Sequence, residues 1–189
     1  CVKSAILDDY LYKDFTQRVE LTSNKDKTLK VEYLNLKEIH QLLSAATDNI
    51  GHRPGFTSRF MIVTAIYTGM RLSEIQALTW NDIDWLHRTI TINKSWDART
   101  NDFKPTKNES SNRKIKVNPE LLNYLKILQE HRRSNLVFMS QYGTIPTSNA
   151  VNKTLRSLLT ALNIHRSGFH FHSLRHSHVA LLLANGIDI

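Results

Sequence analysis

The chain has 189 residues, enough for one domain of ordinary size and part of a second. Its single cysteine excludes an intrachain disulfide, and no apolar run reaches the roughly 18 residues of a membrane span. Because 25 Lys and Arg outnumber 17 Asp and Glu, the net charge is +8, which favours a polyanionic partner such as nucleic acid.

The N-terminal segment lacks the pattern of a signal peptide and does not begin with Met, so we expect an excised fragment of a cytoplasmic protein. Residues 22–28 are polar without an apolar residue, which is typical of a linker. We therefore expect residues 1–28 to be the tail of a preceding domain with its linker. Residues 29–189 are expected to form a separate domain.

Helical periodicity dominates the remainder. After Asn35, a good N-cap, apolar residues recur every three or four positions, beginning with Leu36 and Ile39. Six helices are expected in chain order. The first begins at Asn35, the second spans Thr57–Tyr67 and ends at Gly69, and the third runs from Leu72 to Trp80–Asp82. The fourth begins at Asn118, the fifth at Thr147 or Ser148, and the last runs from His172 or Ser173 to Gly186.

Two segments alternate apolar and polar residues as strands do, Thr89–Asn93 and Lys114–Val117. The twenty residues between them are mostly polar, which indicates a long hairpin with a mobile tip. Leu136–Phe138 is a further candidate for a short strand. The fold class expected is mainly α with one small antiparallel β-sheet, that is, α+β.

Two arginines, Arg71 and Arg175, each stand at the start of a predicted helix. A guanidinium donates two parallel hydrogen bonds and stays charged, so two of them suit the non-bridging oxygens of one phosphodiester. The N-terminus of the helix that begins beside Arg71 would also favour a bound anion, through its free amides and the positive end of its dipole. His172 shares a helix face with Arg175, and Lys107 lies on the predicted hairpin. Together these groups suit phosphoryl transfer without a metal.

Each residue also has a simpler interpretation. Arg71 could form a surface ion pair with Glu74, Lys107 could be a solvated loop residue, and His172 could be structural. Arg175 is harder to explain in that way, because a half-buried guanidinium inside an apolar helix requires an anion. The hypothesis of a phosphate site therefore depends on the combination.

The histidines His170, His172, His176 and His178 raise the possibility of zinc, since His172 and His176 are spaced i and i+4. No Cys, Asp or Glu stands near them to complete such a site, and Arg175 would place a cation beside the metal. We therefore expect no metal, and expect the other three histidines to pack or to face DNA.

Three segments resemble the tyrosine recombinases, and more narrowly the integrases of phages and conjugative elements. Thr68–Trp80 followed by Asp82–Asp84 is similar to the first arginine box of that family. Pro105–Ile115 is similar to its hairpin-lysine segment, and His172–Gly186 to its second box. The resemblance extends from about residue 30 to the end of the chain.

The resemblance implies the catalytic fold of the DNA breaking-rejoining enzymes, preceded by the end of a core-binding domain. Arg71 and Arg175 would bind the scissile phosphate, Lys107 would protonate the 5′ leaving oxygen, and His172 would assist in acid/base chemistry. The family cleaves and rejoins double-stranded DNA at a recombination site through a 3′-phosphotyrosine, without metal, ATP or other cofactor. The full-length protein would act as an oligomer on DNA, in the cytoplasm and nucleoid, without a membrane.

The family's tyrosine lies beyond its second box. The tyrosines of this chain all precede His172, at Tyr10, Tyr12, Tyr33, Tyr67, Tyr124 and Tyr142. We therefore expect this fragment to bind DNA weakly and not to cleave it. The main alternative is a non-catalytic basic DNA-binding module, and a third is a metal-dependent nuclease that uses the histidines.

Overall fold

The computed structural model describes residues 6–10, 12–13, 32–106 and 111–184. The chain divides into two compact units, residues 1–30 and residues 31–189. The expected linker at residues 22–28 and the expected helix cap at Gly186 lie outside the described residues. The helices and strands named below all belong to the second unit.

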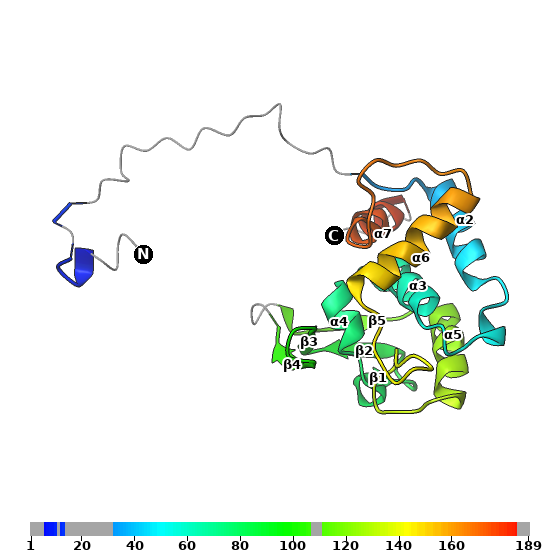
Figure 1. Cartoon of the computed structure of the whole chain (residues 1–189), viewed down its shortest axis with the longest axis horizontal. Helices are drawn as coiled ribbons and strands as arrows, with labels where there is room; N and C mark the ends of the chain where they lie inside the picture. The colour runs from blue at the N-terminus through cyan, green and yellow to red at the C-terminus, as the bar shows by residue number, and fades with distance from the viewer. Residues whose placement is uncertain (1–5, 11, 14–31, 107–110, 185–189) are drawn as a thin grey trace. The chain divides into compact units, whose positions relative to one another are not determined.

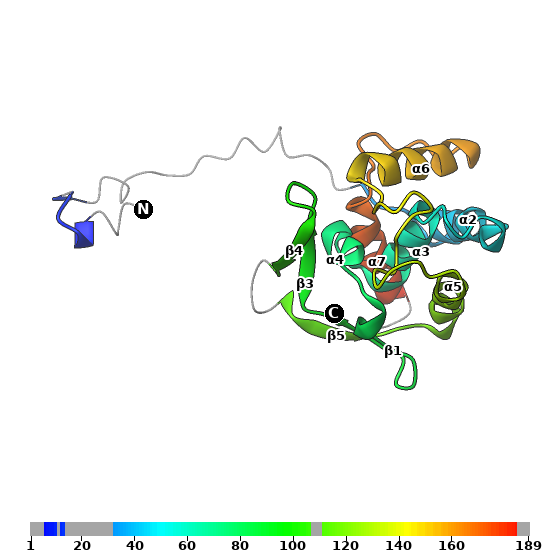
Figure 2. The ribbon, with the colours of Figure 1, turned by 60° about the horizontal axis from the view of Figure 1, so that its bottom comes forward.

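The core of this unit is built around α3 (Ser58–Thr68), in which every residue from Phe60 to Ile66 is buried. A helix that is apolar on all sides must be covered on all sides. Four amphipathic or partly apolar helices surround it, as Figures 1 and 2 show: α2 (Leu36–Thr47), α5 (Pro119–Glu130), α6 (Ser148–Ala161) and α7 (Ser173–Ala184).

The predicted helix starts are confirmed where the sequence supplies a cap. Asn35 accepts a hydrogen bond from the amide of Glu38, and the Glu38 carboxylate accepts one from the amide of Asn35, a reciprocal capping box. Thr147 caps α6 in the same position by accepting from the amide of Ala150. These local bonds fix where α2 and α6 begin.

Helix α5 begins at Pro119, and the Asn118 side chain accepts a 2.8 Å hydrogen bond from the amide of Glu120. We expect Asn118→Ala to lower the free energy of unfolding by about 1 kcal/mol, because that amide loses its acceptor. Urea titration followed by circular dichroism measures this change. Asn118→Asp keeps the acceptor and serves as the control. Equal unfolding midpoints for Asn118→Ala and the unaltered chain would contradict the expectation.

The two predicted strands are confirmed and pair directly. β2 (Thr89–Ile92) lies antiparallel to β5 (Arg113–Lys116), with Ile90 opposite Ile115. A two-residue strand, β1 (Ile83–Asp84), extends the sheet in the order β1-β2-β5. The pattern of alternation did not reveal β1, because two residues are too short to alternate visibly.

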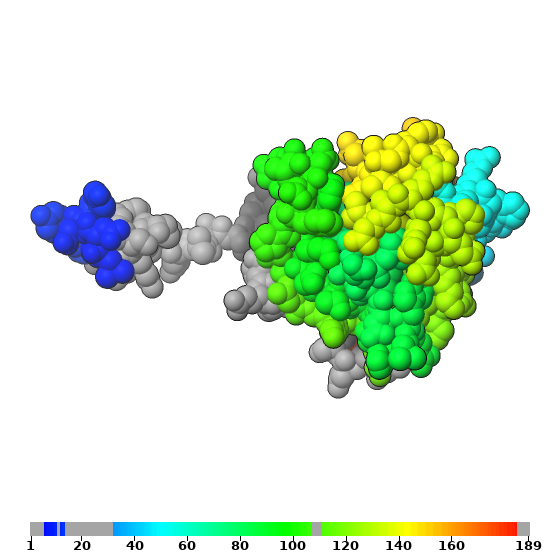
Figure 3. Space-filling model, turned by 90° about the horizontal axis from the view of Figure 1, so that it is seen from below, coloured from blue at the N-terminus to red at the C-terminus, as the bar shows by residue number. Residues whose placement is uncertain are grey.

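The polar segment between the two predicted strands continues the hairpin that the sequence predicts. It contains a second antiparallel hairpin, β3 (Lys94–Asp97) with β4 (Asp102–Pro105). The rings of Trp96 and Phe103 meet edge to face across it, 5.5 Å apart. Figure 3 shows this hairpin, in green, beside the segment that leads into α6, in yellow, and the two line a shared groove.

The third helix, α4 (Leu72–Gln76), is shorter than predicted and ends well before Trp80. The chain leaves the helix because Thr79 becomes extended and forms an isolated antiparallel bridge with Leu136. The Asp82 carboxylate accepts hydrogen bonds from both the amide and the hydroxyl of Thr79, which caps a short 3₁₀ turn. The predicted strand Leu136–Phe138 is therefore reduced to this single bridge at Leu136.

Helix α7 starts at Ser173, as predicted, and buries Ser173, Leu174 and Ser177. The Ser177 hydroxyl accepts a hydrogen bond from the amide of Leu34, which joins α7 to the chain just before α2. Farther along, Leu183 is 59% exposed, so the apolar end of α7 is not part of the core. Within the described residues, no helix has the length and apolar character needed to cross a membrane.

Candidate phosphate-binding site

Gly69 turns the chain between α3 and α4. Its φ of 61° lies in the left-handed region, which glycine adopts without strain, and its amide donates to the carbonyl of Ala65 to close α3. Arg71 follows in an extended conformation, immediately before α4. The turn therefore places Arg71 at the junction of the two helices, and the prediction that it starts a helix is confirmed.

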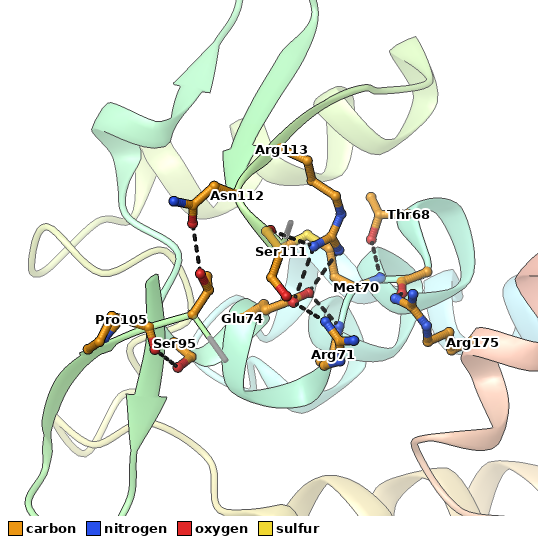
Figure 4. Close-up of polar contacts among 12 residues, drawn as sticks. Thr68, Met70, Arg71, Glu74, Ser95, Pro105, Ser111, Asn112, Arg113 and Arg175 are labelled. Atoms are coloured by element: carbon orange, nitrogen blue, oxygen red, sulfur yellow. Dashed lines mark hydrogen bonds and ion pairs between the residues drawn. The ribbon is translucent and has the colours of Figure 1, made fainter. Parts of the chain in front are cut away.

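The carboxylate of Glu74 forms an ion pair with Arg71, as Figure 4 shows. It accepts hydrogen bonds from the backbone amide and from Nη1 of Arg71, both 2.9 Å long. The Glu74 side chain is 3% exposed, whereas that of Arg71 is 42% exposed. The simpler interpretation of Arg71 is therefore right in part. The ion pair exists, but its carboxylate is buried and its guanidinium still reaches solvent.

A second guanidinium, from Arg113 on β5, binds the same carboxylate. Its Nη2 lies 2.9 Å from Oε2 of Glu74, and its Nη1 lies 3.3 Å from Oε1 (Figure 4). Burial works to raise the pKa of Glu74, but the hydrogen bonds from Arg113 and Arg71 outweigh it and hold the pKa below its usual value. Glu74 is therefore a buried, ionised carboxylate shared by two arginines.

Arg175, on α7, reaches the same place from the other side of the core. Its Nη1 donates a 2.6 Å hydrogen bond to the carbonyl of Gly69. Burial and the nearby charges of Arg71 and Arg113 lower its pKa, while Glu74 opposes them. No carboxylate in the described part of the chain forms an ion pair with Arg175. Three guanidiniums thus accompany one carboxylate, which leaves a net charge of +2.

His172 stands at the edge of this cationic group, just before α7. Its ring stacks with that of His170 at 6.3 Å and meets that of His176 edge to face at 5.5 Å. Desolvation, then the neighbouring histidines, Arg175 and Arg71 lower the pKa of His172. The imidazole is therefore neutral at pH 7, with one nitrogen able to accept a proton.

His178, the fourth histidine of the cluster, turns away from the other three. Its Nδ1 donates to the carbonyl of Ile66, 2.8 Å away, which packs its ring against the end of α3. Over residues 32–106 and 111–184, no three His, Cys, Asp or Glu side chains are grouped as metal ligands.

Lys107, the predicted general acid, lies outside the described residues. Close to the segment 107–110, the hydroxyl of Thr106 donates a 2.7 Å hydrogen bond to the side-chain oxygen of Asn112. Helix α4, whose N-terminus was expected to favour an anion, has only five residues, and the Glu74 carboxylate accepts a hydrogen bond from the amide of Arg71 there.

Comparison with known proteins identifies the chain. Residues 32–189 match the Phage integrase family. The chain belongs to this family. It is 26% identical to the integrase of Staphylococcus phage L54a, over 87% of this chain and 51% of that protein. It is 31% identical to tyrosine recombinase XerC of Pediococcus pentosaceus, over 97% of this chain and 59% of that protein. The chain therefore spans about half the length of these relatives.

Solved structures share the fold. The Tn1549 transposon integrase in complex with transposon right-end DNA superposes with a TM-score of 0.75 at 22% identity, over 98% of this chain and 64% of that chain. XerA recombinase gives a TM-score of 0.65 at 20% identity, over 90% and 54%. The predicted fold is confirmed, an α+β fold with the architecture of tyrosine recombinases.

Arg71, Arg175 and His172, which the sequence singled out, lie within electrostatic reach of one another, but the sequence gave no role to Arg113. Arg113 is a second cationic partner of Glu74. Nothing in the local pattern indicates which of the many lysines and arginines would take that place. The pairing of β5 with β2 decides that, and such pairing is a long-range property.

Proposed function

We propose that this chain is the catalytic domain of a site-specific DNA recombinase or integrase of a mobile element, and that it binds the scissile phosphate. The observation that carries this proposal is the convergence of Arg71, Arg113 and Arg175 around one buried carboxylate, with a net charge of +2. A cationic group that its own carboxylate does not neutralise is suited to a bound anion. Family membership makes a DNA phosphodiester the natural choice.

In this proposal Arg71 and Arg175 bind the two non-bridging oxygens of the phosphodiester and stabilise the charge that develops on them. His172, neutral at pH 7, accepts or returns a proton. Lys107 delivers a proton to the 5′ leaving oxygen. In the parent protein a tyrosine attacks the phosphorus to form a 3′-phosphotyrosine, and a 5′ hydroxyl then attacks this linkage to rejoin the strand. Because the phosphotyrosine conserves the bond energy, the reaction requires no ATP, and it proceeds without a metal.

Tyr67, the described tyrosine nearest to Arg71 in sequence, is not suited to that attack. Its hydroxyl donates a 2.7 Å hydrogen bond to Glu120. Burial and the Glu120 carboxylate raise the pKa of Tyr67 above its usual value, which disfavours the phenolate nucleophile. We infer that the 189-residue chain alone binds duplex DNA without cleaving it. A covalent adduct between this chain and nicked duplex DNA would contradict that inference.

The partner in this proposal is double-stranded DNA at a recombination site, and the parent protein assembles as an oligomer on it. Solved relatives include integrase complexes with DNA and a lambda integrase dimer bound to a core site. Residues 1–28 would be the end of the preceding core-binding domain with its linker, which agrees with a separate compact unit at residues 1–30. The basic surplus of the chain supports binding to the phosphate backbone.

The test is a crystal of this chain soaked in sulfate or vanadate, both of which mimic a phosphodiester. We expect one anion bound by Arg71 and Arg175 together, with His172 adjacent. Anions at two separate places, or none at either guanidinium, would contradict the phosphate site. The chain would then be better explained as a non-catalytic basic DNA-binding module.

A further inference from the structure

Arg113 directs its guanidinium at Glu74, not at solvent. Both of its terminal nitrogens bond to the carboxylate, in a fork that meets both oxygens, and the side chain is 27% exposed. The other two hydrogen bonds to Glu74 come from the amide and Nη1 of Arg71. The carboxylate therefore accepts four hydrogen bonds, two from each arginine.

This sharing determines how much charge Arg71 can offer to a ligand. A buried carboxylate needs a cation, and with Arg71 as its sole partner the two would form a neutral pair. The guanidinium of Arg71 would then be drawn into a full fork around Glu74. Because Arg113 supplies that fork instead, Arg71 needs only its Nη1 for Glu74 and keeps a unit charge for another anion.

The position of Arg113 suits such a supporting role. It lies on β5, paired with Ile92 of β2, and its Nη1 also donates to the carbonyl of Ser111 at 3.1 Å. Arg71, by contrast, stands at a helix junction and is more exposed. Arg113 thus holds the Glu74 carboxylate, and the carboxylate in turn orients the more exposed Arg71.

We propose that Arg113 is a positioning residue for the phosphate site, which neutralises Glu74 so that Arg71 stays free to bind a DNA phosphate. This inference rests on the proposed function of the site. Arg113 acts through Glu74 and Arg71 and does not itself touch the phosphate. It follows that the requirement for Arg113 disappears when Glu74 loses its charge.

The test measures the affinity of the whole 189-residue chain for a short fluorescent duplex DNA by anisotropy. We expect Arg113→Ala to weaken binding about tenfold, since it converts Arg71 into the sole counter-ion of Glu74. Glu74→Gln added to Arg113→Ala restores the original net charge of the site. The double variant should therefore return to within about threefold of the unaltered chain. Recovery of this kind is not expected from a residue that contacts DNA directly.

Lys114→Ala is the matched control, because it removes one positive charge from an exposed position of the same strand. It should change the affinity by less than Arg113→Ala. Circular dichroism melting verifies that each variant is folded. Should Arg113→Ala fail to fold, Arg113→Gln, which keeps one donor for Glu74, replaces it in the same comparison.

The inference can be overturned in two distinguishable ways. If the double variant binds as weakly as Arg113→Ala, or if Arg113→Ala binds as the unaltered chain does, Arg113 is not a positioning residue, while the phosphate site itself stands. If Arg71→Ala and Arg175→Ala leave the affinity unchanged, the phosphate site fails and the role of Arg113 fails with it.

Discussion

Arg175→Ala is expected to weaken the binding of duplex DNA by about 10- to 100-fold. A hydrogen bond to a charged group contributes about 1.5–3 kcal/mol, and in the proposed site Arg175 makes such bonds to a phosphate. Arg175 forms no ion pair with a carboxylate among the described residues, so its charge is not neutralised by a direct partner before a ligand binds. Fluorescence anisotropy at several salt concentrations measures both the affinity and its salt dependence.

The salt dependence distinguishes a phosphate contact from a general effect of charge. Loss of one phosphate contact should reduce the slope of log affinity against log salt by about 1. Arg132→Ala is the control, since Arg132 is exposed beyond the end of α5 and donates no side-chain hydrogen bond to a described residue. Equal losses of affinity in Arg175→Ala and Arg132→Ala would show that the contribution is only that of net charge.

Gly69→Ala is expected to lower the free energy of unfolding by roughly 2–5 kcal/mol, the combined cost of left-handed backbone and overpacking. An added Cβ would stand 2.6 Å from Cδ2 of His178, with φ fixed near 61°. The ring of His178 has little room to retreat, because its Nδ1 is bonded to the carbonyl of Ile66. Urea titration followed by circular dichroism measures the loss.

Gly143→Ala separates the two costs. Gly143 has a similar φ of 70°, but an added Cβ there would meet nothing within 4 Å. It should therefore lose only the conformational part, about 1–2 kcal/mol. Adding His178→Ala to Gly69→Ala should recover part of the difference. If Gly69→Ala and Gly143→Ala destabilise the chain equally, the close approach of His178 has no energetic consequence.

The sequence predicted best what is decided locally. Asn35, Asn118 and Thr147 cap helices by bonding to amides two or three residues away, so their roles are visible in a short window. The turn at Gly69 is local in the same sense. The core face of α5 followed from helical spacing alone, and all four predicted leucines are buried there: Leu121, Leu122, Leu125 and Leu128.

Tertiary contacts decided the elements that the sequence did not predict. Helix α4 was expected to continue because Leu78 fits its apolar stripe, but Thr79 pairs with Leu136, which is remote in sequence. The strands β3 and β4 within the predicted hairpin were not detected, because all four residues of β4 are exposed and burial imposed no alternation on them. A strand without a buried face has no hydrophobic period to detect.

The candidate site likewise contains residues that the sequence predicted and one contact that only the tertiary structure reveals. The chemistry of two arginines at helix starts, and then the family resemblance, predicted that Arg71 and Arg175 act together, and they lie within electrostatic reach of each other. The fork from Arg113 to Glu74 joins β5 to α4 across 39 positions of sequence. Its partners are chosen by the register of β5 on β2, and no local signal encodes it. The role of Lys107 stays a prediction.

The hydrogen bond from Arg175 to the carbonyl of Gly69 joins residues 106 positions apart. A phosphate held by Arg71 and Arg175 would therefore act as a removable cross-link between the first and last thirds of the domain. Like a disulfide, it closes a long loop, but it does so by mass action and without a covalent bond. Binding of DNA and the stability of the packing between α3 and α7 would then be thermodynamically linked.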